Sequence, residues 1–182
     1  MRVVAGTARG RRLRSPEGET TRPTADRVRE SVFNALFSQG RVDGAHVVDL
    51  FAGSGALGIE ALSRGAAHAW FVESDRSAVA VIEDNLDTLG FRASATVIHA
   101  EVTTALASGF ADPADLVLAD PPYAFDDWAG LGGALAPLVD DDGLLVAESG
   151  APVDLGPAWE KLRERTYGGT VITFAHRSGA SA

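Results

Sequence analysis

Asp120, Pro121, Pro122 and Tyr123 carry the clearest chemistry in this sequence, and they directly follow the apolar run Leu116–Ala119. Two prolines at the exit of a strand fix a rigid, extended turn. The carboxylate of Asp120 and the backbone carbonyl of Pro121 can each accept one amine hydrogen, and Tyr123 can stack on a planar ring. Held in this way, the exocyclic amine of a nucleic-acid base would aim its lone pair at a methyl group. We interpret the four residues as a catalytic corner, against the alternative of a proline turn with a packed tyrosine.

A glycine-rich motif precedes this corner. The run Gly53–Gly58 matches G-x-G-x-x-G, and Glu73 follows Gly53 by twenty residues. Close backbone approach and an acid for ribose hydroxyls suit any adenosine cofactor. Asp49 separates the candidates, because it would repel the pyrophosphate of a dinucleotide but attract the ammonium and sulfonium of S-adenosylmethionine. We therefore expect Asp49, Gly53, Gly55 and Glu73 to bind S-adenosylmethionine, unless Asp49 is only a turn carboxylate and Glu73 a solvated strand end.

Three further residues are candidates for the same cofactor. Phe51 lies between Asp49 and the glycines, and Thr24 belongs to an R-P-T segment that leads into the first predicted helix. Glu101 follows a predicted strand and could accept a hydrogen bond from an adenine amino group, or it could be a solvated loop residue. We expect no metal site.

The elements that must position these residues follow from the hydrophobic pattern. From about residue 45 onward, short apolar runs alternate with amphipathic ones, which is typical of an α/β fold with a parallel sheet between helices. The predicted strands are 46–50, 69–73, 96–99, 115–119 and 143–148. The predicted helices are 56–63, 77–89 and 127–139. Segments 162–167 and 170–176 flank Gly168 and Gly169, which predicts a hairpin carrying an antiparallel strand.

The first 45 residues differ from the rest. Residues 1–20 predict an arginine-rich hairpin that extends a main domain over residues 21–182. A helix follows it, with Thr24 as its N-cap and with Arg27 and Arg29 on its outer side. Residues 1–30 hold eight arginines and four acids, a charge of +4, whereas the whole chain carries −9. The remainder therefore carries −13, and such an asymmetry fits either a protein that grips a polyanion at one end or a solvated tail.

Composition excludes several classes of protein. The chain has 182 residues, of which 46% are hydrophobic, and this fits one globular domain. Cysteine is absent, so disulfides, thiolate zinc sites and cysteine nucleophiles are excluded. No apolar stretch reaches the roughly 18 to 20 residues that span a bilayer, and the first residues lack a secretory signal. We expect a cytoplasmic protein without a membrane partner.

The chain resembles a known family, the RsmD-type methyltransferases, which modify the N2 amine of a guanine in small-subunit ribosomal RNA. The resemblance spans nearly the whole chain. The first two of the four blocks that carry it are specific to the family, and the other two are shared widely among class I methyltransferases. The blocks are Gly6–Leu13, Arg22–Glu30, Asp49–Gly65 and Leu118–Tyr123.

The resemblance implies a Rossmann-like class I methyltransferase fold, with a seven-stranded, mainly parallel sheet whose last strand is antiparallel. It also implies S-adenosylmethionine as the cofactor, catalysis by residues 120–123, and a partly assembled 30S particle as the partner. One departure is Glu101, where related enzymes often have an aspartate. The arginines implied to grip the RNA are Arg9, Arg11, Arg12, Arg14 and Arg22.

Three rival functions remain. An adenine-N6 DNA methyltransferase shares the D-P-P-Y chemistry but usually needs a target-recognition region, for which this chain leaves no room. A protein-glutamine methyltransferase would more typically carry Asn at the position of Asp120. A non-catalytic RNA-binding assembly factor would not need the intact acidic and glycine residues. The residues alone do not separate guanine N2 from adenine N6, and we expect a monomer.

Overall fold

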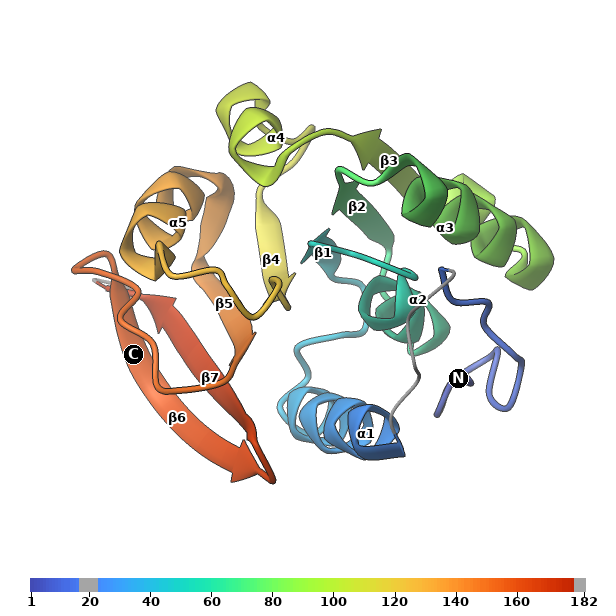
Figure 1. The fold of residues 1–182 in the computed structure, drawn as a ribbon, viewed down its shortest axis with the longest axis horizontal. Coiled ribbons are helices and arrows are strands. Elements are labelled where there is room, and N and C mark those ends of the chain that lie inside the picture. Colours follow the sequence, from blue (N-terminus) through green and yellow to red (C-terminus); the bar gives the residue numbers. More distant parts are fainter. Residues whose placement is uncertain (17–22, 179–182) are drawn as a thin grey trace.

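Seven strands form one sheet in the order β3-β2-β1-β4-β5-β7-β6 in the computed structural model, which describes residues 1–16 and 23–178 (Figure 1). The first five strands are mutually parallel, and β7 is antiparallel to both of its neighbours. The predicted antiparallel strand near the C-terminus is thus confirmed. The strands are β1 His46–Leu50, β2 His68–Glu73, β3 Ala95–His99, β4 Ala114–Ala119, β5 Val139–Ser149, β6 Trp159–Tyr167 and β7 Thr170–Arg177.

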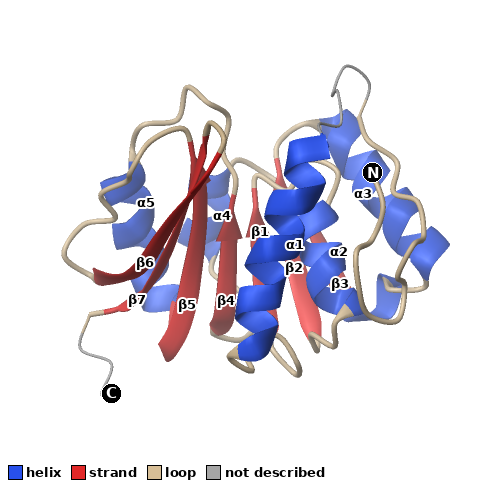
Figure 2. Cartoon of the chain, turned by 90° about the horizontal axis from the view of Figure 1, so that it is seen from below, coloured by secondary structure: helices blue, strands red, loops and turns tan. Residues whose placement is uncertain are grey.

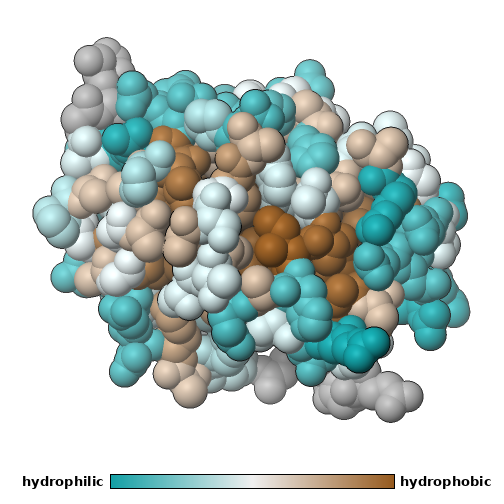
Figure 3. Space-filling view, turned by 90° about the horizontal axis from the view of Figure 1, so that it is seen from above, coloured by the Kyte–Doolittle hydropathy of each residue, from teal (hydrophilic) through white to brown (hydrophobic). Residues whose placement is uncertain are grey.

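Helices cover both faces of the sheet, because the central strands are apolar on both sides (Figure 2). Side chains of α1, α2 and α3 pack on one face with Phe71 and Leu118, and those of α4 and α5 pack on the other with Leu50 and Val117. On the α4 and α5 side, hydrophilic residues lie mainly around the rim, and hydrophobic residues are visible near the middle (Figure 3). The helices are α1 Pro23–Ser38, α2 Ala56–Ser63, α3 Arg76–Leu89, α4 Val102–Ser108 and α5 Trp128–Leu135, with short 3-10 turns at Arg92–Ser94 (η1) and Ala136–Leu138 (η2).

Three predicted boundaries were wrong by three residues or more. The helix expected over 127–139 ends at Leu135, because Pro137 cannot continue the backbone hydrogen bonding and forms a 3-10 turn instead. Strand β5 then begins at Val139 rather than at residue 143, and β6 begins at Trp159 rather than at 162. Helix α4 was not predicted, since its seven residues are too few to show a helical period.

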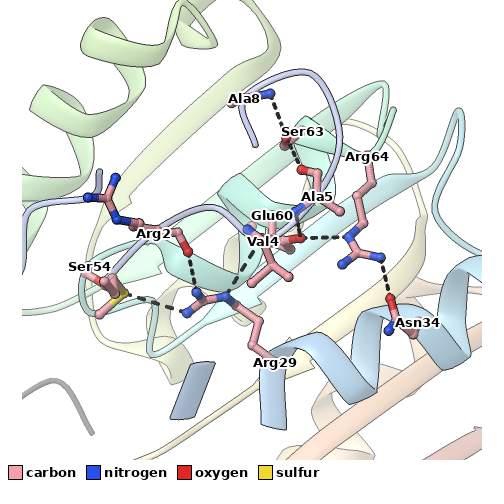
Figure 4. Close-up of polar contacts among 12 residues, drawn as sticks. Arg2, Val4, Ala5, Ala8, Arg29, Asn34, Ser54, Glu60, Ser63 and Arg64 are labelled. Carbon is pink, nitrogen blue, oxygen red and sulfur yellow. Dashed lines mark hydrogen bonds and ion pairs between the residues drawn. The ribbon is translucent and has the colours of Figure 1, made fainter. Parts of the chain in front are cut away.

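The N-terminal segment folds back on itself and docks on helix α2. A single antiparallel bridge joins Arg2 to Arg12, so this part of the chain pairs with itself without regular strands, and residues 17–20 of the predicted hairpin lie outside the described residues. Glu60 of α2 accepts hydrogen bonds from the backbone nitrogens of Val4 and Ala5, at 2.7 and 3.0 Å (Figure 4). The hairpin is therefore fixed to α2, which packs on one face of the sheet.

The prediction for the outer side of the first helix was wrong at one position. Arg29 is buried, donates to the backbone oxygen of Arg2 at 2.6 Å and lies 3.9 Å from Glu60, while Arg64 donates to Glu60 at 2.7 Å. Thr24 is also not the N-cap, because α1 begins at Pro23, a residue suited to the first helical turn. Among the described residues, no helix is long and apolar enough to cross a membrane.

Candidate active site

Four carboxylates stand side by side where the parallel strands end. Asp49 on β1 is aligned with Leu118 of β4 and Phe71 of β2, and Leu118 is aligned with Val146 of β5. Side chains two residues apart on a strand share a face, so the acids two positions beyond these partners lie on the face of Asp49. Those acids are Glu73 on β2, Asp120 after β4 and Glu148 on β5. The row runs across the carboxyl edge of the sheet, where open α/β sheets bind ligands.

Asp49 is buried with one oxygen lacking a partner. Its Oδ2 accepts a hydrogen bond from the backbone nitrogen of Gly58 at 2.8 Å, but its Oδ1 has no hydrogen-bond partner among the described residues. Burial raises the pKa of Asp49 well above its ordinary value; the Gly58 hydrogen bond opposes this shift, and the charges of Asp120 and Glu73 add to it. A buried, unsatisfied carboxylate of this kind fits a cationic group such as an ammonium.

The glycine loop between β1 and α2 has the conformation that its residues predict. Gly53 and Gly55 have φ of 54° and 76°, in the left-handed region that favours glycine. Gly58 lets α2 lie close to β2, since a Cβ there would collide with the ring of Phe71. Phe51 has φ 58°, which is uncommon for a residue with a side chain. The loop thus presents backbone to the carboxyl edge beside Asp49.

Glu73 holds this loop in place. Its Oε2 accepts a hydrogen bond from the nitrogen of Gly53 at 2.8 Å, and its Oε1 accepts one from the nitrogen of Asp75 at 2.8 Å. Each carboxylate oxygen has a second lone pair, so Glu73 can still accept bonds from ribose hydroxyls. Glu101 is exposed ahead of α4 and makes no side-chain cap there, while the side chain of Thr24 lies outside the described part of the chain.

The proline turn after β4 is open to solvent. Asp120 and Pro122 are exposed, Pro121 is half-buried, and the nitrogen of Phe125 donates to the oxygen of Pro122 at 2.8 Å to close the turn. The side chain of Tyr123 is 83% exposed, which contradicts the alternative of a packed tyrosine. A flat ring can therefore reach both Asp120 and Tyr123.

Aromatic contacts join this turn to the glycine loop. The ring of Phe125 lies 5.4 Å from that of Phe51 and 5.2 Å from that of Trp128, measured between centroids. Trp128, the first residue of α5, is buried in the core. Phe125 thus links the proline turn to the glycine loop.

The candidate RNA-binding arginines divide into two groups. The guanidinium of Arg11 donates to the backbone oxygen of Thr88, and that of Arg14 donates to Asp84 at 2.8 Å. Arg9 and Arg12 are exposed, and within the described ranges their side chains make no hydrogen bond or ion pair. Arg22 lies outside the described residues. Arg9 and Arg12 are thus the two hairpin arginines most available to phosphates.

Sequence reasoning missed Glu148, which no motif contains. Its position beside Asp120 comes from the pairing of β5 with β4, in which Ala147 is aligned with Ala119. A signal existed in the acid that ends the predicted strand 143–148, but the order of the strands was needed to interpret it. No group of three or more His, Cys, Asp or Glu residues that could hold a metal ion is found in the described part of the chain.

Comparison with known proteins places the chain among relatives of one kind. The family described as conserved hypothetical protein 95 matches residues 1–176. YlbH of Bacillus subtilis, provisionally named an rRNA methyltransferase, is 38% identical over 98% of this chain and 100% of its own length. Ribosomal RNA small subunit methyltransferase D of Escherichia coli K12 is 41% identical over 82% of this chain and 71% of its own length. The chain belongs to this RsmD-type family.

Solved structures agree with the family assignment. The RsmD-type chain superposes on YhhF of Escherichia coli, provisionally titled a methyltransferase, with a TM-score of 0.85, 35% identity and 97% coverage of both chains. Magnesium protoporphyrin IX methyltransferase of Synechocystis PCC 6803, solved with bound S-adenosylmethionine, superposes with a TM-score of 0.67 at 18% identity, over 88% of this chain and 87% of that chain. At such low identity the second likeness supports the fold alone, and the predicted class I methyltransferase fold is confirmed.

Proposed function

We propose that this chain transfers a methyl group from S-adenosylmethionine to the exocyclic N2 amine of a guanine in small-subunit ribosomal RNA. The observation that supports this most directly is the position of Asp49 beside Asp120. A buried carboxylate oxygen without a partner lies next to an exposed turn that can hold an amine. The names of the relatives supply the class of RNA.

The residues around Asp49 suit S-adenosylmethionine. In this proposal Asp49 would hold the cofactor's ammonium, the backbone of Gly53 to Gly55 would hold its methionine moiety, and Glu73 would accept hydrogen bonds from its ribose hydroxyls. Phe51 and Glu101 are proposed contacts to the adenosine. When bound, the cofactor supplies a methyl group made electrophilic by the adjacent sulfonium.

Asp120 and Pro121 prepare the amine. The amine of a base is a poor nucleophile because its lone pair is delocalised into the ring. Two acceptors fixed by the proline turn, the Asp120 carboxylate and the Pro121 carbonyl, engage both amine hydrogens and orient the lone pair toward the methyl carbon. The ring rests on Tyr123. Transfer would break the bond between the methyl carbon and sulfur, with S-adenosylhomocysteine as the leaving group. The methylated nitrogen would then carry an extra proton, which the Asp120 carboxylate can accept.

The hairpin offers the RNA a second contact away from this edge, because its turn packs against Ser63 and Thr88 near the carboxyl-terminal ends of α2 and α3. Arg9 and Arg12 offer charges to phosphates, and Arg11 and Arg14 support the hairpin on α3 through Thr88 and Asp84. We propose that the substrate is a partly assembled 30S particle and that the enzyme acts as a monomer. Comparing transfer to particles with transfer to naked RNA tests the first point, and sedimentation of the purified protein tests the second.

The catalytic assignment is tested with Asp120→Ala. Labelled methyl transfer to small-subunit particles that lack the mark should fall about 100-fold or more, because the amine loses an orienting acceptor, while cofactor binding stays close to wild type. The matched control is Asp112→Ala, an exposed acid before the amino end of β4, which should transfer at the wild-type rate. Equal rates for Asp120→Ala and wild type would refute the assignment.

Digestion of the methylated RNA to nucleosides then identifies the base. N2-methylguanosine is the expected product, whereas N6-methyladenosine would replace guanine with adenine in the proposal. Binding to the particle without any transfer would favour the non-catalytic assembly factor.

A further inference from the structure

Glu148 is an acid that the proposed mechanism has not used. It is half-buried on β5, and within the described ranges its carboxylate makes no hydrogen bond and no ion pair. The charged group that faces it is Asp120 on the neighbouring strand β4, and Ile172, which faces it from β7, is uncharged. Burial, and then the charge of Asp120, raise the pKa of Glu148 to about 7. A half-buried carboxylate beside another carboxylate is unfavourable unless a donor is placed between them.

The spacing of the two acids suits the edge of a base. Asp120 and Glu148 each follow an aligned pair, Ala119 and Ala147, on adjacent parallel strands, so their backbones are roughly 4.8 Å apart. Both side chains point to the sheet face that carries Asp49, whose unpartnered oxygen marks that face as the ligand side. A planar ring whose amine is held by Asp120 therefore has its neighbouring ring atom toward Glu148.

That neighbouring atom differs between the purines. Two ring atoms flank each amine: N1–H, a donor, and N3, an acceptor, beside the N2 amine of guanine, but unprotonated N1, an acceptor, and C5 beside the N6 amine of adenine. Guanine alone offers a ring N–H donor next to its amine. An ionised carboxylate can accept a hydrogen bond and cannot donate one. Glu148 in its charged form therefore matches guanine and repels adenine.

We propose that Glu148 is a specificity-determining residue, which as a carboxylate accepts the N1–H of the guanine whose N2 amine is held by Asp120 and Pro121. This inference rests on the proposed methyl transfer and adds the group that reads the base. It also predicts a pH dependence, since the charged carboxylate of Glu148 accepts N1–H more strongly than the carbonyl oxygen of the neutral acid does. Transfer to guanine should rise as pH increases through about 7.

The test uses Glu148→Gln in the full chain, with Glu160→Gln as the matched control, because Glu160 is an exposed acid on β6. Initial rates of labelled methyl transfer to unmethylated small-subunit particles are measured between about pH 6 and pH 9, and products are identified as nucleosides. Wild type and control should give N2-methylguanosine with kcat/KM rising through about pH 7. Glu148→Gln should lose that rise and fall about 10- to 100-fold in kcat/KM at high pH, with cofactor affinity unchanged.

The outcomes are distinct from failure of the proposed function. Absence of methyl transfer by wild type removes the function itself, and an adenine product removes the guanine reading. If wild type yields N2-methylguanosine while Glu148→Gln keeps its kcat/KM and its pH profile, the specificity role is overturned and the function stands. A wild-type profile that is flat through about pH 7 overturns it without any variant, and Glu148→Asp should recover part of the pH-dependent rise.

Discussion

At the scale of single residues, the main feature of the site is one carboxylate that is buried in the folded protein although its burial is energetically unfavourable. Asp49 is 1% exposed and satisfies only one of its two oxygens among the described residues. The fold tolerates this because the hydrogen bond from Gly58 and the surrounding core determine its position. Such unfavourable groups are typical of binding sites, where a ligand supplies the missing partner.

Asp49→Asn should therefore stabilise the empty protein and weaken cofactor binding. Burial raises the pKa of Asp49, so the folded state binds this proton more tightly than the unfolded state does. The stabilisation from that proton is fully present at pH below the ordinary pKa of 3.8 and is lost as pH rises toward the folded pKa. The variant lacks this loss, so its Tm should exceed that of wild type by about 2–6 °C at high pH, with the difference shrinking in acid. S-adenosylmethionine affinity, measured by calorimetry, should drop about 100-fold.

The pH dependence of binding gives a second check on the same residue. Wild-type affinity for S-adenosylmethionine should increase with pH as Asp49 ionises, and Asp49→Asn should bind equally weakly throughout. The exposed control Asp112→Asn should match wild type in both Tm and affinity. Tight, pH-dependent binding by Asp49→Asn would show that another group receives the ammonium.

The position of a site residue could be predicted from the sequence where a motif placed that residue near the end of a strand. Asp49, Glu73 and Asp120 each close an apolar run, so their common edge followed from the α/β pattern. Glu148 has the same kind of position but gains its meaning only from β5 lying beside β4. Strand order depends on contacts between distant segments, which no local pattern contains.

At the scale of elements, helix α2 connects the carboxyl edge of the sheet to the hairpin. It starts at the glycine loop and carries Glu60, which is fully buried and receives donors from Val4, Ala5 and Arg64 (Figure 4). The amphipathic pattern of α1 predicted that Arg29 faces solvent. Such a pattern depends only on the residues of the helix itself, so it could not show that Glu60 on α2 pairs with Arg29. The burial of the Arg29 side chain could therefore not be predicted from the sequence.

Glu60→Gln should loosen the hairpin as well as lower stability. Removing the charge takes the counter-ion from the buried guanidinium of Arg64, which costs about 3–5 kcal/mol. Urea denaturation should report this loss, and trypsin should cut after Arg9, Arg11 or Arg12 faster than in wild type. The control is Glu83→Gln, whose partner Arg92 is exposed and whose effect should stay below about 1 kcal/mol. Unchanged proteolysis in a destabilised Glu60→Gln would show that the hairpin is held by other contacts.

At the scale of the whole molecule, charge is distributed unevenly between hairpin and body. The chain carries −9 in total, yet two of its hairpin arginines, Arg9 and Arg12, project without partners from the described residues. A polyanion can approach such a protein productively from that side, because elsewhere the acidic surface repels it. This asymmetry was visible in the sequence, but which arginines remain available was not.

Arg9→Ala combined with Arg12→Ala should weaken binding to small-subunit particles and reduce its dependence on salt. Each lost phosphate contact should lower the slope of log affinity against log salt by about one. The matched control replaces Arg163 and Arg165, two exposed arginines on β6 at the far edge of the sheet, and should leave the slope unchanged. Equal effects of the two pairs would mean that the attraction depends only on total charge.

The contacts between the hairpin and α2 also determine which other segments could replace the hairpin. Gly6 has φ 81°, and a Cβ at this position would overlap the carbonyl oxygen of Ser63, while the nitrogen of Ala8 donates to the hydroxyl of the same serine at 3.0 Å. A segment transplanted in place of residues 1–16 would therefore need glycine at position 6 and two successive free N–H groups facing Glu60. Loops that meet this template could redirect the enzyme to other RNAs without disturbing its catalytic edge.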